Sequence, residues 1–171
     1  TAEAISDMNK SIELDPASVI SYQTLASIYT AEQKFDMALN TIDKALLVNA
    51  NDGESYRIKG TVYFYMNDTI NAITYLDKAV EVAPQNPKMY TSRGAIYKDI
   101  NKPDMAMADY NKALEINPND AEALARKGIV YLLQKKYKEA VEFMEKGLSI
   151  DPNMESGIKQ YLDQARANLK K

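Results

Sequence analysis

Residues 87–120 read PKMYTSRGAIYKDINKPDMAMADYNKALEINPND, and the pattern of apolar residues in this segment indicates a helical fold. Its apolar side chains recur three and four residues apart in two runs, which is the spacing of one face of an α-helix. Asn101 lies between the runs, where a left-handed residue would end the first helix, and Asn tolerates that conformation better than most residues. Pro103 lies where the second helix would begin, a place that does not need its missing N–H. The stretch therefore predicts two amphipathic helices joined by a short turn.

The same pattern recurs along the whole chain every 34 residues. Several series of positions keep this period without an insertion. They are Ala4, Ala38, Ala72, Ala106 and Ala140; Tyr29, Tyr63, Tyr97 and Tyr131; Ala26, Gly60, Gly94 and Gly128; Ser11, Ala45, Ala79, Ala113 and Gly147; and Pro16, Ala50, Pro84, Pro118 and Pro152. A fixed period of this length is typical of repeat proteins, in which each helix pair buries its apolar surface against its neighbours. We therefore expect an all-α fold.

The period organises residues 1–171 into a single domain of repeats. Residues 1–18 form a half repeat with a second helix alone, and full repeats follow at residues 19–52, 53–86, 87–120 and 121–154. Residues 155–171 predict a terminal helix with an apolar stripe and a polar back, as a capping helix requires. Because Thr1 begins in the middle of a repeat, we expect the chain to be part of a longer protein.

These residues resemble the tetratricopeptide repeat (TPR) family, and the resemblance covers virtually the whole chain. In one repeat the matching residues are Tyr90, Gly94, Tyr97, Ala106, Tyr110, Ala113 and Pro118. The chain departs from the family pattern at Lys59, Arg93 and Lys127, where the usual residue is Leu, but long basic side chains can cover apolar surface with their stems. The resemblance implies a right-handed α-solenoid of antiparallel helix pairs, the TPR superhelix, whose concave surface is offered to a protein partner.

The composition argues against catalysis and against several kinds of partner. The chain contains no Cys and no His, which removes thiolate and imidazole chemistry and nearly every transition-metal site, so we expect no enzyme activity and no cofactor. With 24 acidic and 21 basic residues the net charge is −3, so nucleic acid is not an expected partner. No apolar run approaches the roughly 20 residues of a membrane span, so we expect no direct membrane insertion. The absence of Cys is compatible with reducing and oxidising compartments alike, including the cytoplasm and the periplasm, and assigns neither.

The candidate site follows from a helical wheel of the first helix of each repeat. The side opposite the recurring core residues should line the concave surface. The residues predicted there to bind a partner are Arg57, Phe64, Tyr65, Lys88, Lys98, Arg126, Ile129, Leu132 and Leu133. Phe64, Tyr65, Leu132 and Leu133 are apolar where water would be expected, and two interpretations stay open for them: a binding patch, or side chains that fold over the helix end into the core.

The sequence thus predicts a non-catalytic scaffold that binds a peptide or a partner helix in its concave groove. The alternative is a structural unit that self-assembles into a homo-oligomer. Some TPR domains clamp the acidic C-terminus of heat-shock chaperones through Lys, Asn and Arg at fixed positions of three first helices. In this chain, the frame that starts at the first full repeat holds Gln23, Ser27, Ile58, Lys88 and Ser92 at those positions, and the next frame does not restore the clamp. Recognition of a chaperone tail is therefore disfavoured.

Overall fold

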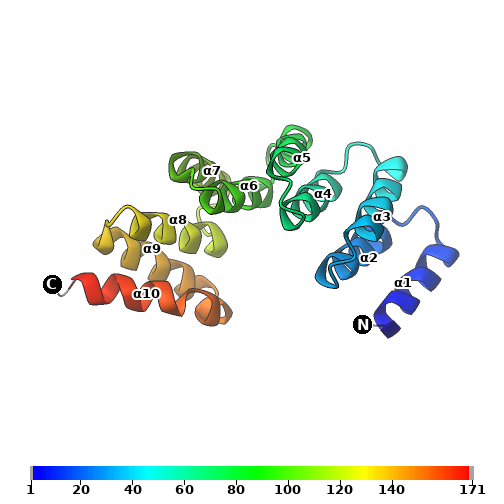
Figure 1. Ribbon diagram of the computed structural model, residues 1–171. Coiled ribbons are helices and arrows are strands. Elements are labelled where there is room, and N and C mark those ends of the chain that lie inside the picture. Colours follow the sequence, from blue (N-terminus) through cyan, green and yellow to red (C-terminus); the bar gives the residue numbers. More distant parts are fainter. Residues whose placement is uncertain (1, 170–171) are drawn as a thin grey trace. The chain divides into compact units, whose positions relative to one another are not determined.

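The computed structural model describes residues 2–169, in which all regular structure is helical (Figure 1). The helices are α1 (Ala2–Leu14), α2 (Val19–Ala31), α3 (Phe35–Val48), α4 (Gly53–Tyr65), α5 (Thr69–Val82), α6 (Pro87–Asp99), α7 (Pro103–Ile116), α8 (Ala121–Leu133), α9 (Tyr137–Ile150), the 3-10 turn η1 (Pro152–Met154) and α10 (Glu155–Leu169). The predicted all-α fold is confirmed. Within the described residues, no helix has both the length and the apolar character needed to cross a membrane.

The first helix of each full repeat begins at a polar residue that caps it. Asp52 accepts a hydrogen bond from the backbone N–H of Ser55 at 2.6 Å, and Asp120 accepts one from Ala123 at 2.9 Å. Ser18 and Asn86 hold the same place before α2 and α6. Each of these side chains satisfies one of the backbone donors that the first helical turn leaves without a partner. A capping residue therefore recurs every 34 residues, at the start of the first helix of each full repeat.

The turn inside each repeat depends on one residue with a left-handed backbone. Asn101 has a φ of 59° and Pro103 is the first residue of α7, as the sequence predicted, and Asn67 at the equivalent position has a φ of 61°. Gln33 and Lys135 hold the same repeat position with φ of 60° although neither is Asn. The tight turn therefore forms at this position in every full repeat, with a less suitable residue in two of them.

The second helices end two residues before the closing proline position. α5 ends at Val82 before Pro84, and α7 ends at Ile116 before Pro118, since the residue that precedes a proline is pushed out of helical conformation. α3 ends at Val48 in the same register although residue 50 is Ala. Proline is therefore not needed to end that helix.

The chain forms two compact units, residues 1–84 and 85–171, called here the N-terminal and C-terminal units. In the N-terminal unit, Leu25 of α2, Ile42 of α3 and Val62 of α4 belong to one buried cluster. In the C-terminal unit, Met144 of α9 and Leu162 of α10 belong to another, together with residues of α8. Each unit therefore has a hydrophobic core of its own.

Close helix contacts inside each unit need a residue without a side chain. A Cβ atom built on Gly60 would lie 2.9 Å from the carbonyl oxygen of Ala72, and one on Gly128 would lie 2.9 Å from that of Ala140. Real Cβ atoms do not approach so closely, so α4 and α8 could not pack as they do against α5 and α9 with a larger residue. At both places the recurring glycine of one helix therefore lies against the recurring alanine of its partner helix.

The basic residues at the family's usual Leu position cover the core with their stems. Lys59 is buried, its Nζ lies 2.5 Å from Oδ1 of Asp43, and it also lies 4.4 Å from the ring centre of Tyr75. Burial lowers the pKa of Lys59, but the hydrogen bonds to Asp43 and Tyr75 outweigh this effect and the net pKa is raised. Arg93 forms two hydrogen bonds with Asp109, at 2.9 and 2.6 Å. Lys59 and Arg93 therefore each pair with a carboxylate.

Candidate binding grooves

A groove of about 830 Å³ opens in the C-terminal unit, and we call it the C-terminal groove. Its lining comes from α6, α8, α10 and the helix ends beside them. Four of the predicted partner-binding residues line it together: Lys88, Lys98, Arg126 and Ile129. The structure therefore brings nearly half of the predicted set into one concave site.

The floor of the C-terminal groove is apolar. Ala125 and Ile129 of α8 and Ile158 of α10 line it, and all three are buried and belong to the core of the unit. Tyr161 of α10 lines the groove as well and is half-buried. An apolar ligand group that enters the groove would therefore rest on the rigid core of the unit.

The rim of the C-terminal groove carries charges of both signs, most of which already have partners. Arg126 donates to Glu122 one helical turn away, at 2.8 Å, and the Nζ of Lys98 lies 2.6 Å from Oδ1 of Asp99. The carboxylates of Asp120 and Asp151 accept hydrogen bonds from backbone N–H groups at helix starts. Basic and acidic residues are equally numerous in the lining, so the groove carries no excess charge.

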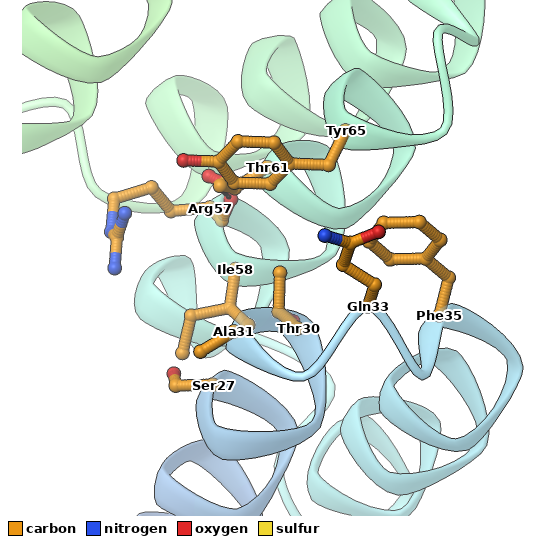
Figure 2. Close-up of a pocket in the computed structure, with 9 residues that line it drawn as sticks. All are labelled: Ser27, Thr30, Ala31, Gln33, Phe35, Arg57, Ile58, Thr61 and Tyr65. Carbon is orange, nitrogen blue, oxygen red and sulfur yellow. Dashed lines mark hydrogen bonds between the residues drawn. The ribbon is translucent and has the colours of Figure 1, made fainter.

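A second pocket, of about 630 Å³, lies in the N-terminal unit between α2 and α4 (Figure 2). We call it the N-terminal pocket. It contains two more of the predicted residues, Arg57 and Tyr65, and the ring of Tyr65 lies near Thr61 in the view. Arg57 makes a two-pronged ion pair with Glu54, at 2.9 and 2.8 Å, which fixes the guanidinium at the pocket edge.

Hydroxyl groups form much of the polar lining of the N-terminal pocket. Ser27 donates to the carbonyl of Gln23 at 2.9 Å, and Thr30 donates to that of Ala26 at 2.7 Å. Thr61 donates in the same way to the carbonyl one turn earlier in α4. Because each hydroxyl hydrogen is already used within its own helix, the oxygens can act only as acceptors toward a ligand.

Three predicted residues lie outside both cavities. Leu132 is only 6% exposed and packs in the core of the C-terminal unit, so its prediction as an accessible anchor is wrong and the core interpretation holds. Phe64 is half-buried, with its ring 6.1 Å from that of Tyr65, and does not line the N-terminal pocket. Leu133 is 60% exposed but does not line the C-terminal groove. Neighbours in one helical turn thus have different environments.

Some lining residues were missed by the sequence reasoning. Ser27, Thr30 and Ala31 of the first full repeat hold the same helix positions as Thr61, Phe64 and Tyr65, so the helical wheel would have named them had it been applied to residues 19–52. Lining residues of α10 and of the helix ends, such as Asn119 and Asn153, carry no signal of this kind. These residues line the groove because of the way in which α10 packs against the rest of the C-terminal unit, which the sequence pattern does not indicate.

Metal chemistry has no evident site in this part of the protein. In residues 2–169, no group of three or more Cys, His, Asp or Glu side chains is arranged to hold a metal ion. The acidic groove residues are ion-paired or cap helices, as described above. The chemistry that the two cavities offer is therefore hydrogen bonding, charge pairing and apolar contact.

Several solved structures share this fold. MamA is 23% identical over 89% of both chains, with a TM-score of 0.66. YrrB, described as "a TPR protein with an unusual peptide-binding site", is 22% identical over 99% of this chain and 84% of its own, with a TM-score of 0.63. TTC0263, a TPR protein of Thermus thermophilus, is 17% identical over 95% of this chain and 89% of its own, with a TM-score of 0.82. At these identities the likeness shows the fold alone, an all-α repeat solenoid.

Sequence comparison gives the family. No curated protein matches the chain. Models described as "Tetratricopeptide repeat" match residues 19–52, 53–86, 87–120 and 109–142, which together span most of the sequence. The matching residues include the Gly, Ala and Tyr series that pack the helix pairs in the structure. The chain therefore belongs to the tetratricopeptide repeat family.

Proposed function

We propose that the chain is a non-catalytic protein-interaction module that holds a peptide or a partner helix in the C-terminal groove. The observation that carries this proposal is the combination of a buried apolar floor with a rim of both charge signs. Binding interfaces commonly have this arrangement, because the floor supplies apolar contact and the rim supplies orientation.

The dimensions of the C-terminal groove suit a short segment. Its volume of about 830 Å³ lies within the range of ligand sites in proteins. Lys88 and Lys98 are ten residues apart on α6, which at 1.5 Å per residue separates their backbones by about 15 Å. An extended peptide advances about 3.3 Å per residue, so four or five residues would span this distance.

The charge of the rim favours one class of peptide over another. Lys88, Lys98 and Arg126 are matched by Asp120, Glu122 and Asp151 in the lining, so a strongly acidic or strongly basic peptide gains no net attraction there. We propose that this groove takes a segment of mixed or no charge with one apolar side chain directed to Ile129. Family membership supports an interaction scaffold in general terms, and YrrB offers a precedent for peptide binding on this fold.

The test is to select ligands from a random twelve-residue peptide library on the immobilised chain and to measure the affinity of the selected peptides by calorimetry. For selected peptides that contain acidic residues, the double variant Lys98→Ala, Arg126→Ala should weaken binding roughly tenfold, since each exposed pairing contributes up to about 1 kcal/mol. Lys112→Ala, on α7 and outside the groove, is the matched control and should leave the affinity unchanged. Selected peptides that bind both variants as well as the unaltered chain would place the site elsewhere.

A second candidate function is self-assembly, and two exposed apolar residues of the N-terminal unit favour it. Leu47 is 86% exposed, although two other full repeats hold Glu at this position, at residues 81 and 115. Ile20 is 73% exposed, where Glu54 and Glu122 occupy the equivalent places. Sedimentation should then show a dimer or larger species that Leu47→Glu dissociates. A monomer at all accessible concentrations would remove this candidate.

A further inference from the structure

The turn between α8 and α9 differs in charge from the other turns inside the repeats. Lys135, Lys136 and Lys138 lie in it or in the first turn of α9, and Lys127 reaches toward it from α8. We call these four residues the lysine turn. The equivalent turns at residues 31–36, 65–70 and 99–104 each contain at least one acidic residue and none contains more than one lysine. The positive charge is thus local, in a chain whose net charge is −3.

Lys135 is poorly suited to its backbone conformation. It has φ of 60°, in the left-handed region, where a side chain with a Cβ atom is strained and Asn is the best tolerated alternative to Gly. Two other repeats hold Asn67 and Asn101 at this position. Turn formation therefore does not explain a lysine here.

Lys138 opposes the dipole of its own helix. It lies in the first turn of α9, where the exposed backbone N–H groups carry partial positive charge and acidic side chains are favourable. The first turns of α3 and α7 hold Asp36 and Asp104 at the equivalent position. A lysine in place of Asp is therefore unfavourable for helix stability.

Lys127 lacks the carboxylate that its counterpart has. Its Nζ lies 2.6 Å from the amide oxygen of Asn111, whereas Lys59 reaches Asp43 at the corresponding place in the N-terminal unit. Burial lowers the pKa of Lys127. The Nζ atoms of Lys127 and Lys136 lie 5.9 and 5.7 Å from the ring centre of Tyr131, so both ammonium groups are close to the same aromatic ring.

No ion pair neutralises these charges within residues 2–169. The ion pairs of that part of the chain involve other cations, and none includes a member of the lysine turn. Lys135 and Lys138 each add positive charge at the expense of local stability, and Lys127 lacks the carboxylate partner that Lys59 has. Residues that break local rules without a structural gain mark functional sites.

We propose that the lysine turn docks an acidic segment of a partner protein, with Leu133 as the adjoining apolar contact. Leu133 ends α8 immediately before the turn and is largely exposed, so a partner side chain can cover it. The inference rests on the proposed interaction function but uses a surface outside the C-terminal groove.

The surroundings favour a short acidic segment over a long polyanion. Glu139 and Glu142 follow on α9 and are exposed, so positive charge is confined to the turn and a polyanion that extends beyond it would meet acidic residues. Leu133 offers apolar contact that a phosphate backbone cannot use. The complementary partner is therefore a segment with several Asp or Glu residues beside one large apolar side chain.

The experiment measures fluorescence anisotropy of a labelled Glu-Glu-Leu-Glu-Glu peptide with the full chain at low salt. Lys135→Asn with Lys138→Asp, which copies the residues of another repeat, should weaken binding of this probe about tenfold. The same double variant should raise the melting temperature by roughly 2–4 °C, because it relieves the left-handed lysine and places a second acidic residue beside Glu139 in the first turn of α9. If Lys135 and Lys138 served only to stabilise the fold, replacing them would lower the melting temperature. A higher melting temperature together with weaker probe binding would therefore indicate a binding role.

Matched controls separate the contribution of the lysine charges from that of the apolar contact at Leu133. Lys102→Asn changes a lysine at the position of Lys136 in the α6–α7 turn, beside Asp104, and should leave probe binding unchanged. Leu133→Ser should weaken binding of the leucine probe but not of Glu-Glu-Ser-Glu-Glu. Higher salt should weaken both peptides, since the attraction is between exposed charges.

Three outcomes overturn the proposal. One is a probe that does not bind, and another is a probe that binds the double variant as tightly as the unaltered chain. The third is that an oligothymidylate or vesicles of phosphatidylserine bind the lysine turn more tightly than the acidic peptide does. The groove variant Lys98→Ala, Arg126→Ala should not affect the acidic probe, so failure here leaves the proposed groove function separately testable.

Discussion

At the scale of single residues, Tyr110 of α7 matches the family pattern but differs from the residues at the same position of the other repeats in this chain. Its side chain is fully buried, and its hydroxyl has no hydrogen-bond partner among residues 2–169. The equivalent positions hold Ile42, Leu76 and Met144, which are also fully buried but carry no polar group. An unsatisfied buried hydroxyl destabilises the fold, so Tyr110→Phe should raise the free energy of unfolding by about 1 kcal/mol. Urea unfolding measures this change, and a loss of stability would mean that the hydroxyl has a partner such as an ordered water.

The same residue predicts a dependence on pH. Burial raises the pKa of the Tyr110 phenol above its ordinary value of 10. The folded chain therefore keeps the proton when the unfolded chain has lost it, and the associated stability is complete below pH 10 and is lost as the pH rises further. Melting temperatures between pH 9 and 11 should fall less steeply for Tyr110→Phe than for the unaltered chain. Equal slopes would show that this phenol does not titrate differently on unfolding.

At the scale of helices, the contact between the two members of a pair depends on small residues. Ala106 of α7 is fully buried at the position that recurs as Ala72 and Ala140. Ala106→Leu should overpack the pair and cost about 1–3 kcal/mol of folding stability. Lys112→Ala should change stability little, because Lys112 pairs only with Glu115 at the surface. Thermal unfolding of both variants checks the assignment, and equal effects would mean that the faces of α7 are misassigned.

The helices were predictable because their signals are local. Asn67, Asn101 and Pro103 act through backbone conformation at their own positions, and the period of the Ala series reports packing between neighbouring helices. Ala50 shows that such local signals are not complete. The helix α3 ends two residues before position 50, as the other second helices end before their prolines, although residue 50 is Ala.

The candidate site was only partly predictable because burial there depends on distant residues. Leu132 and Leu133 are adjacent and equally apolar, yet Leu132 joins the core that α10 completes while Leu133 is exposed. A helical wheel places both on the groove side, since it contains no information on where α10 packs. The charged residues Lys88, Lys98 and Arg126 were easier to place, because a charged side chain is rarely buried unless, like Lys59, it is paired.

At the scale of the whole molecule, the two units suggest how the chain unfolds. Each unit has its own buried cluster, and the stability of a repeat protein is approximately a sum of terms for each repeat and for its nearest neighbours. A local defect should therefore lower stability most in its own unit. Gly60 and Gly128 offer matched places for such a defect, since each lies against the carbonyl of the recurring Ala in the partner helix.

We expect Gly60→Val to destabilise the N-terminal unit and Gly128→Val the C-terminal unit. In each variant the added side chain must push the helix pair apart, at a cost of about 1–3 kcal/mol. Hydrogen exchange of the full chain, followed by mass spectrometry, measures protection helix by helix. Gly60→Val should lower protection in α4 and α5 more than in α8 and α9, and Gly128→Val should do the reverse. If either substitution lowers protection equally in all four helices, the chain unfolds as one cooperative body and the repeats are coupled far beyond their nearest neighbours.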